Sequence, residues 1–350
     1  MNNNVFRVQV GDQVDSGALA EFLRRVYRPN KSQFVIEHGR WLYRGVENQW
    51  VVVNSAEKIV AYCAVIPTRC SINGEPVEAL WWVDLIVDPA YRGQGIQSII
   101  DTRLRQRSAL KLGIPNALAA KIHRKHGWGV RENGATLMLP LRPLGVKQVQ
   151  LATGFRGVAL TVGAAMLSPL AAMWRLRLRP TPHHTAKRVY HAQAQDLAAI
   201  FEQHKAQMPV TTYRDRLYIQ WRYLDAPYAQ ALRIYTAGPN KMSTCCLIAR
   251  YVTFKNVKAV RIIDLFGDLT DLPSVRDLVR QAAYEAGLWG ATQITIFNFL
   301  PELKQLLRRL GFIVSVPGRF CWHSQDTRLM QQFETQLHWT IGDSDNDEPE

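Results

Sequence analysis

Apolar residues along the chain fall into short runs typical of strands and into wider spacings typical of amphipathic helices. In the first half the pattern predicts strands at Trp50–Val53, Ile59–Pro67 and Trp81–Val87, a helix at Ile96–Leu112, a strand at Asn116–Ala120 and a Gly-Trp pair at 127–128. In the second half it predicts strands at Ala231–Tyr235 and Thr244–Phe254, a helix at Ser274–Leu288, a strand at Gln293–Phe297 and a Gly-Phe pair at 311–312. This mixture of strands and helices is typical of an α/β or α+β fold.

The two halves also share sequence landmarks at one spacing. Trp41–Tyr43 matches Trp221–Tyr223 after a shift of 180 positions, and the same shift places Val83–Leu85 on Ile263–Leu265. Two matches at one spacing predict a duplicated unit.

A glycine-rich turn separates the run Trp81–Val87 from the helix that begins at Ile96. The turn reads Arg-Gly-Gln-Gly, with glycines at 93 and 95. Glycines let the backbone approach a ligand closely, and the first amides of a helix attract an anion. The turn is therefore predicted to bind a pyrophosphate. The matching stretch of the second half carries Asp268 and Asp271, which would repel one.

This turn resembles the acyl-CoA signature of the GCN5-related N-acetyltransferase (GNAT) superfamily: Arg or Gln, two residues, Gly, one residue, then Gly or Ala. Arg92 takes the first place and Gly95 the central one, whereas Gln97 stands where the family prefers a small residue. The resemblance implies acyl-CoA as cosubstrate. Its expected binding residues are Arg92, Gly93, Gln94, Gly95, Ile96, Gln97, Ser98 and Asn116.

The resemblance further implies tandem GNAT-like domains, each a mixed central sheet flanked by helices. The expected parts are an acyl-CoA-binding domain at 1–145, an apolar linker at 146–186, a degenerate domain at 187–328 and an acidic tail at 329–350, mobile and solvated after Gly342. In the second domain Trp221, Arg222 and Tyr223 combine aromatic faces with a guanidinium, which suits substrate binding. Their match to Trp41–Tyr43 favours a packing role instead.

Transfer of an acyl group from a thioester requires oxyanion donors and proton transfer. The resemblance implies that the fourth strand splays away and offers the amides of Leu85, Ile86 and Val87 as oxyanion donors. The family often has a proton-donating tyrosine four residues before the Gly-aromatic pair, and here that position is His123. Histidine can donate a proton near neutral pH. A basic surface turn is the alternative role. Asp84 is the candidate base, although its counterpart Asp264 favours a structural role.

The charge of the chain bears on its partners. Its 43 Lys and Arg against 29 Asp and Glu give a net charge of +14, which favours CoA, an acyl carrier protein or anionic lipid. No nucleic-acid signature is found, so no such partner is expected. The five cysteines have neither disulfide nor metal-site spacing, and no signal peptide is evident. The chain is therefore expected in the cytoplasm.

An uncharged run covers Gly157–Trp174 between Arg156 and the arginines at 175, 177 and 179. It is too polar for a membrane span. A linker helix buried against both domains is the preferred interpretation. The alternative is peripheral contact with the inner membrane through residues 157–179.

The sequence thus predicts an acyl-CoA-dependent N-acyltransferase that acts on an amine. The stretch around Trp221 resembles two-domain proteins of bacterial polysaccharide loci, which implies an amino sugar as acceptor. One alternative is an N-acyltransferase that uses acyl carrier protein, which a basic surface would attract. Another is a non-catalytic CoA-binding scaffold of a membrane-linked synthase, favoured by Gln97 and the missing tyrosine.

Overall fold

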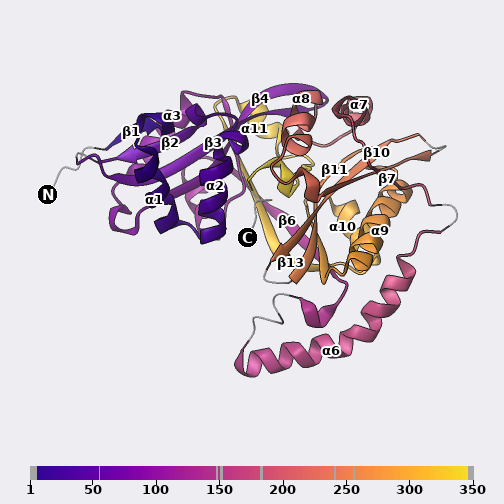
Figure 1. Ribbon diagram of the computed structural model, residues 1–350. Helices are drawn as coiled ribbons and strands as arrows, with labels where there is room; N and C mark the ends of the chain where they lie inside the picture. Colours follow the sequence, from indigo (N-terminus) through magenta and orange to yellow (C-terminus); the bar gives the residue numbers. More distant parts are fainter. Residues whose placement is uncertain are drawn as a thin grey trace.

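The computed structural model describes residues 6–345 except 55, 147–148, 150–152, 182–183, 240–241 and 255–256. In these residues one sheet of 13 strands runs through the whole molecule (Figure 1). The strands of the first half are β1 (Arg7–Val10), β2 (Gln49–Val53), β3 (Ile59–Ile72), β4 (Glu75–Val87), β5 (Leu110–Gly113) and β6 (Gly129–Pro140). Those of the second half are β7 (Lys187–Val189), β8 (Thr211–Thr212), β9 (Leu232–Ala237), β10 (Cys245–Phe254), β11 (Val257–Gly267), β12 (Gln293–Asn298) and β13 (Ile313–Ser324).

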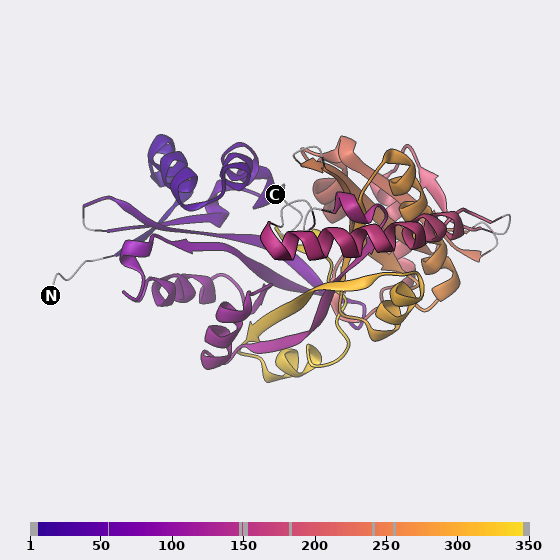
Figure 2. The same cartoon turned by 90° about the horizontal axis from the view of Figure 1, so that it is seen from below.

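Helices cover both faces of this sheet. They are α1 (Ser16–Val26), α2 (Pro29–Leu42), α3 (Ile96–Arg105), α4 (Ala117–Lys125), α6 (Gly154–Arg177), α7 (Ala194–His204), α8 (Arg216–Ile219), α9 (Leu272–Trp289), α10 (Pro301–Arg309) and α11 (Thr327–Gln332). In the first half, α1 and α2 lie on one face and α3 and α4 on the other (Figure 2). Apolar side chains fill both interfaces, with Phe22 and Phe34 on the first and Ile100 and Leu104 on the second.

The same order of strand pairing occurs in both halves. β1, β2, β3 and β4 pair antiparallel in sequence, and β4 then pairs parallel with β5. β7, β9, β10 and β11 repeat the antiparallel series, and β11 pairs parallel with β12. The predicted α/β class, a large mixed sheet flanked by helices, is confirmed.

The two halves exchange their last strands. β13 lies between β5 and β6, and β6 pairs on its other side with β12. Residues 313–324, assigned from the sequence to the second domain, therefore complete the sheet of the first half. The domain boundaries themselves stay a prediction, because the exchange joins the halves into one sheet.

Two local assignments around the turn are wrong. The predicted helix Ile96–Leu112 ends at Arg105, and its last apolar residues belong to β5. The predicted strand Asn116–Ala120 is the start of α4, whose first turn is capped by Asn116 through a bond from the Ala119 amide at 2.9 Å. His123 consequently lies in a helix and not in a surface turn.

The acidic tail is not solvated in its described part. Asp343 and Ser344 are almost fully buried, as are Trp339 and Thr340 before them, and residues 346–350 lie outside the described chain. The expectation of a solvated tail after Gly342 is therefore wrong for its described residues. Its apolar and hydrogen-bonding residues pack between the halves.

The preferred interpretation of the linker is also wrong. Residues 157–174 do form a helix, within α6, but most of its large side chains are exposed, among them Phe155 at 91% and Met166 at 75%. Figure 1 shows α6 along the outside of the second half, below the sheet.

Candidate functional site

The glycine turn before α3 is open to solvent. Gly93 and Gly95 both have φ of +78°, the left-handed region that favours glycine. A Cβ at either position would meet no atom within 4 Å. Gly95 is the N-cap of α3, and no side chain caps this helix end. The first amides of α3 thus face space that an anion can enter.

Asp88 shapes the approach to this turn. Its carboxylate accepts a bond from the Ala90 amide at 3.0 Å and one from Arg25 of α1, also at 3.0 Å. These two contacts fix the short 3₁₀ turn Pro89–Tyr91 that leads into Arg92. Asp88 therefore has a structural role.

Strands β4 and β5 part directly beside the turn. Their parallel pairing covers only Leu80 with Lys111 and Trp81 with Leu112. Beyond that point the register of β4 against β3 shifts by one residue, and Asp84 adopts a φ of +56°. Such a bulge bends a strand away from its neighbour.

A cavity of about 230 Å³ opens where the strands part. It is lined by Trp82, Val83, Asp84, Leu85, Gln97, Gly113, Ile114, Pro115, Asn116, Ala119, Ile122, His123, Cys321 and Asp345. We call it the β4–β5 cleft. Five residues expected at the site from the sequence meet in it: Asp84, Leu85, Gln97, Asn116 and His123. Ile86 and Val87 lie outside it and pair with β3.

Asp84 is held by three side chains. Its carboxylate has no exposed surface and contacts the Lys31 ammonium and the hydroxyls of Tyr43 and Tyr27. Such a carboxylate is well placed to organise its neighbours, and poorly placed to reach a substrate.

The tail brings a second carboxylate to the same ammonium group. Asp345 Oδ2 lies 3.4 Å from Lys31 Nζ, and Asp345 also lines the cleft. Burial, together with the charge of Asp84, raises the pKa of Asp345 to about 6. Apart from its acidic neighbours, no sequence feature marks Asp345 as a site residue, because 261 positions separate it from Asp84.

His123 lies between two indoles on the wall of the cleft. Its ring centroid is 4.5 Å from that of Trp128 and 5.6 Å from that of Trp82. Burial lowers the pKa of His123 to about 4, so the ring is neutral at pH 7. A neutral ring is a weaker acid than the sequence-based role requires. Burial also raises the pKa of the Cys321 thiol, which leaves that group protonated.

In the second half, the described residues of the tail contact the matching strand, β11. Leu265, the counterpart of Leu85, has its carbonyl oxygen 2.6 Å from His338 Nε2 of the tail. Asp268 accepts bonds from the amides of Thr270 and Asp271, and Asp271 in turn caps α9. The amide donors that would hold a pyrophosphate are thus occupied by carboxylates of the chain itself.

The expectation that Trp221, Arg222 and Tyr223 bind substrate is corrected. Tyr223 and Arg222 are at most 1% exposed, and Trp221 is partly buried. Trp221 Nε1 donates to the Trp41 carbonyl at 2.9 Å, and Trp41 Nε1 donates to the Trp221 carbonyl at 3.0 Å. Arg222 donates to the carbonyls of Gly342 and Ser344, each at 2.6 Å. These side chains join the two halves and the tail.

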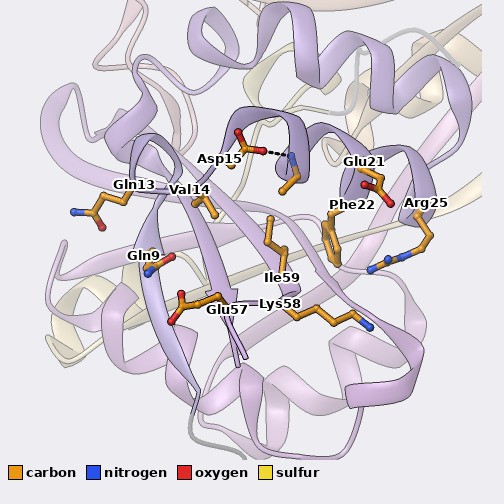
Figure 3. A pocket seen from close by; sticks show the side chains of 11 residues that line it. Gln9, Gln13, Val14, Asp15, Glu21, Phe22, Arg25, Glu57, Lys58 and Ile59 are labelled. Atoms are coloured by element: carbon orange, nitrogen blue, oxygen red, sulfur yellow. Dashed lines mark hydrogen bonds between the residues drawn. The ribbon is translucent and has the colours of Figure 1, made fainter. Parts of the chain in front are cut away.

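A larger recess of about 430 Å³ lies beside α1 (Figure 3). Asp15, Glu21 and Glu57 line it together with Arg25 and Lys58. The Asp15 carboxylate already caps α1 by accepting a bond from the Ala18 amide at 2.8 Å. Three carboxylates oppose an anionic ligand, so the β4–β5 cleft is the better acyl-CoA site.

Comparison with known proteins found one family match. Residues 12–131 match the model of the acetyltransferase (GNAT) domain, a range that includes the turn, α3, α4 and all residues of the cleft except Cys321 and Asp345. Among curated proteins, no sequence relative was found.

Solved structures share the fold over most of this chain. N-myristoyltransferase of Saccharomyces cerevisiae with bound myristoyl-CoA is similar at a TM-score of 0.62 and 11% identity, over 91% of this chain and 79% of that one. A GCN5-related N-acetyltransferase from Anabaena variabilis gives a TM-score of 0.58 and 14% identity, over 92% and 73%. A probable N-acyltransferase from Enterococcus faecalis gives a TM-score of 0.57 and 11% identity, over 94% of this chain and 74% of that one.

These likenesses extend across both halves and the exchanged strands. At these identities they show the fold, and the domain match supports an acyl-CoA-dependent acyltransferase. Residues 12–131 thus match an acetyltransferase (GNAT) domain, in a chain that shares the fold of solved N-acyltransferases.

Proposed function

We propose that the chain transfers an acyl group from acyl-CoA to an amine, and that it does so only at the β4–β5 cleft. The observation that carries this proposal is the parting of β4 and β5 next to an uncapped helix end with two open glycines. The helix end suits the pyrophosphate, and the parted strand offers backbone groups to the thioester arm.

The reaction needs few side chains. The amine nitrogen attacks the thioester carbonyl carbon, a C–N bond forms, the C–S bond breaks, and CoA leaves as a thiolate. A backbone amide of the β4 bulge near Leu85 would stabilise the oxyanion. The amine loses one proton to a base, and the thiolate takes up one proton from solvent.

Asp345 is the base that we favour. A carboxylate whose pKa is raised to about 6 binds a proton more readily than an ordinary one and is still ionised at pH 7. Asp84, the base expected from the sequence, would instead fix Lys31 and thereby position Asp345. This assignment is supported by the contact of both carboxylates with Lys31.

His123 contributes as a wall of the cleft. In the neutral state its N–H can donate a hydrogen bond to the departing sulfur but cannot supply an imidazolium proton. We therefore expect His123 to affect the position of the thioester more than the proton transfer.

The donor and acceptor classes remain proposals. Acyl carrier protein would be attracted by the net charge of +14, whereas the open glycine turn favours the pyrophosphate of CoA. An amino sugar acceptor rests on sequence resemblance alone. A CoA-binding scaffold without turnover is the alternative that Gln97 favours, since this side chain lines the cleft.

A thiol-release assay separates these possibilities. Purified protein would be supplied with acetyl-CoA or longer acyl-CoA and a panel of amino sugars, amino acids and peptides. Release of CoA thiol that depends on both acyl-CoA and amine supports the transferase. Binding of CoA without amine-dependent release across the panel would favour the scaffold.

A further inference from the structure

Helix α6 presents a continuous row of large apolar side chains to solvent. The row consists of Phe155, Val158, Val162, Met166, Leu167, Leu170, Met173 and Leu176, whose exposure ranges from 91% at Phe155 to 47% at Met173. Successive members are mostly three or four residues apart, so they share one face of the helix. α6 carries more exposed large apolar residues than any other helix in the described chain.

The opposite face of α6 attaches it to the protein. Gly157, Ala164 and Ala171 are buried and follow each other at intervals of seven residues. At the end of the helix, Arg280 of α9 donates to the carbonyls of Arg177 at 2.6 Å and Arg179 at 3.0 Å. The apolar row therefore points away from the body of the protein, and Figures 1 and 2 show α6 as an outer layer on the second half.

The two hydroxyl side chains of α6 donate hydrogen bonds within the helix. The Thr161 hydroxyl donates to the Gly157 carbonyl at 2.8 Å, and the Ser168 hydroxyl donates to the Ala164 carbonyl at 2.9 Å. Because both donors are satisfied within the helix, its outer face can enter an apolar medium without an unpaired group.

The chain segment that contains α6 has basic residues and no acidic ones. From residue 133 to residue 195 the sequence has no Asp or Glu. In the same segment the basic residues are Arg142, Lys147, Arg156, Arg175, Arg177, Arg179, Lys187 and Arg188. Arg177 and Arg179 at the end of α6 are exposed, while the side chains of Trp174 and Arg175 lie outside the described part. Such a segment is attracted to a negatively charged surface.

A lipid surface satisfies both features at once. No helix in the described residues combines the length and hydropathy that crossing a membrane requires. α6 also contains Pro169, which removes one backbone hydrogen bond from the helix interior. We propose that α6 lies in the plane of an anionic lipid surface, with its apolar row among the acyl chains and Arg177 and Arg179 at the headgroups. This contact is independent of the proposed transferase chemistry.

Flotation with lipid vesicles tests the proposal on the full chain. The protein should float with phosphatidylcholine vesicles that contain phosphatidylglycerol, bind weakly to phosphatidylcholine alone, and lose binding as salt increases. The combined variant Val162→Asp, Met166→Asp and Leu170→Asp should partition at least about tenfold less, because three apolar contacts are replaced by charges that anionic lipid repels. Arg177→Glu with Arg179→Glu should lower binding to anionic vesicles by about tenfold.

A matched control adds the same charge elsewhere. Leu217, Met242 and Leu288 are about as exposed as the residues of the row but lie outside α6. Their combined change to Asp should leave binding within about twofold of the unchanged protein, since the apolar row is intact. All variants alter exposed positions, so thermal unfolding should be similar to that of the original chain.

Other results would overturn the proposal. Equal losses of vesicle binding in the α6 variant and in the control would mean that net charge, and not the apolar row, determines binding. Absence of flotation with anionic vesicles would exclude a lipid contact. A dimer in light scattering that the α6 variant converts to a monomer would assign this face to a second copy of the chain.

Discussion

Two carboxylates of the cleft differ in what surrounds them. Asp84 is enclosed by Lys31 and two tyrosines, whereas burial and the charge of Asp84 raise the pKa of Asp345 to about 6. The three contacts of Asp84 suit a positioning residue, and the raised pKa of Asp345 suits a proton acceptor.

Asp345→Asn should therefore lower turnover by about a hundredfold, within the usual range of one proton-transfer group. In the original chain kcat/KM should rise with pH through about 6, because the carboxylate accepts a proton only when ionised. The variant should lack this limb of the pH profile. An unchanged limb in the variant would assign the titration to another group.

His123→Ala should have a smaller effect, with turnover falling by less than about tenfold and CoA affinity nearly unchanged. The reason is that burial lowers the pKa of His123 to about 4 and leaves no imidazolium to donate a proton at neutral pH. Steady-state kinetics with one amine would measure this. A loss above about a hundredfold would restore the proton-donor role expected from the sequence.

Single residues were only partly predictable. Asp84, Leu85, Gln97, Asn116 and His123 line one cleft, and their roles in binding and catalysis stay predictions. Asp345 was missed because its position depends on how the tail folds back across the molecule. No local pattern records such a contact.

At the scale of elements, the tail closes the second half. Residues 337–344 pack against β11, where His338 Nε2 contacts the Leu265 carbonyl and a Cβ at Gly342 would lie 2.6 Å from the Ile263 carbonyl. The counterpart of this backbone in β4 borders the open cleft. The tail thus covers the strand β11 in the second half and places Asp345 in the β4–β5 cleft of the first half.

The buried His338 makes stability depend on pH. Burial lowers the pKa of His338 to about 4, while in the unfolded chain it is about 6.5. Below pH 6.5 the unfolded state therefore binds the proton first, and native stability falls until about pH 4. The change attributable to His338 is up to about 3 kcal/mol.

His338→Gln removes this titration, so the difference in unfolding free energy between the original chain and the variant should shrink as pH falls from 7 to 4. Urea unfolding at several pH values measures it. Parallel curves for the two proteins would mean that His338 does not titrate in this window.

Strands and helices with a regular apolar period were predicted correctly from the sequence. β2, β9, β10, β12 and α9 follow the predicted runs, because each has a regular period and a clear end. The helix that begins at Ile96 was extended through Leu110 and Leu112, since their apolar spacing continues that of α3. Those residues belong to β5, and tertiary pairing with β4 and β13 decided the outcome.

At the scale of the molecule, the exchange of β6 and β13 binds the halves together, and a buried ion cluster holds the tail against the second half. Arg214 Nη2 contacts Asp264 at 2.8 Å and Asp343 at 3.0 Å, and all three side chains are fully buried. The repeat of Trp41 and Trp221 predicted two similar halves. It could not predict that each half would complete its sheet with a strand from the other, because strand order is a nonlocal property.

Arg214→Met should lower the free energy of unfolding by about 3 to 5 kcal/mol, because it leaves two buried carboxylates without their partner. Arg69→Met, which removes a partly exposed pair with Asp215, should cost less than about 1 kcal/mol. Both proteins should unfold in one transition by circular dichroism and by tryptophan fluorescence. Two separate transitions would mean that the halves are energetically independent.

The central claim is that acyl-CoA binds once, at the turn before α3. Titration calorimetry with CoA tests it most directly, on the original chain, on Gly95→Glu and on Gly290→Glu. Gly290 is the matched control, since it also has a left-handed φ, of +91°, and a Cβ there would come no closer than 3.8 Å to another atom. We expect one site per chain, no measurable binding to Gly95→Glu because the new charge faces the pyrophosphate, and unchanged affinity for Gly290→Glu. Two sites per chain, or CoA binding that survives Gly95→Glu, would contradict the account.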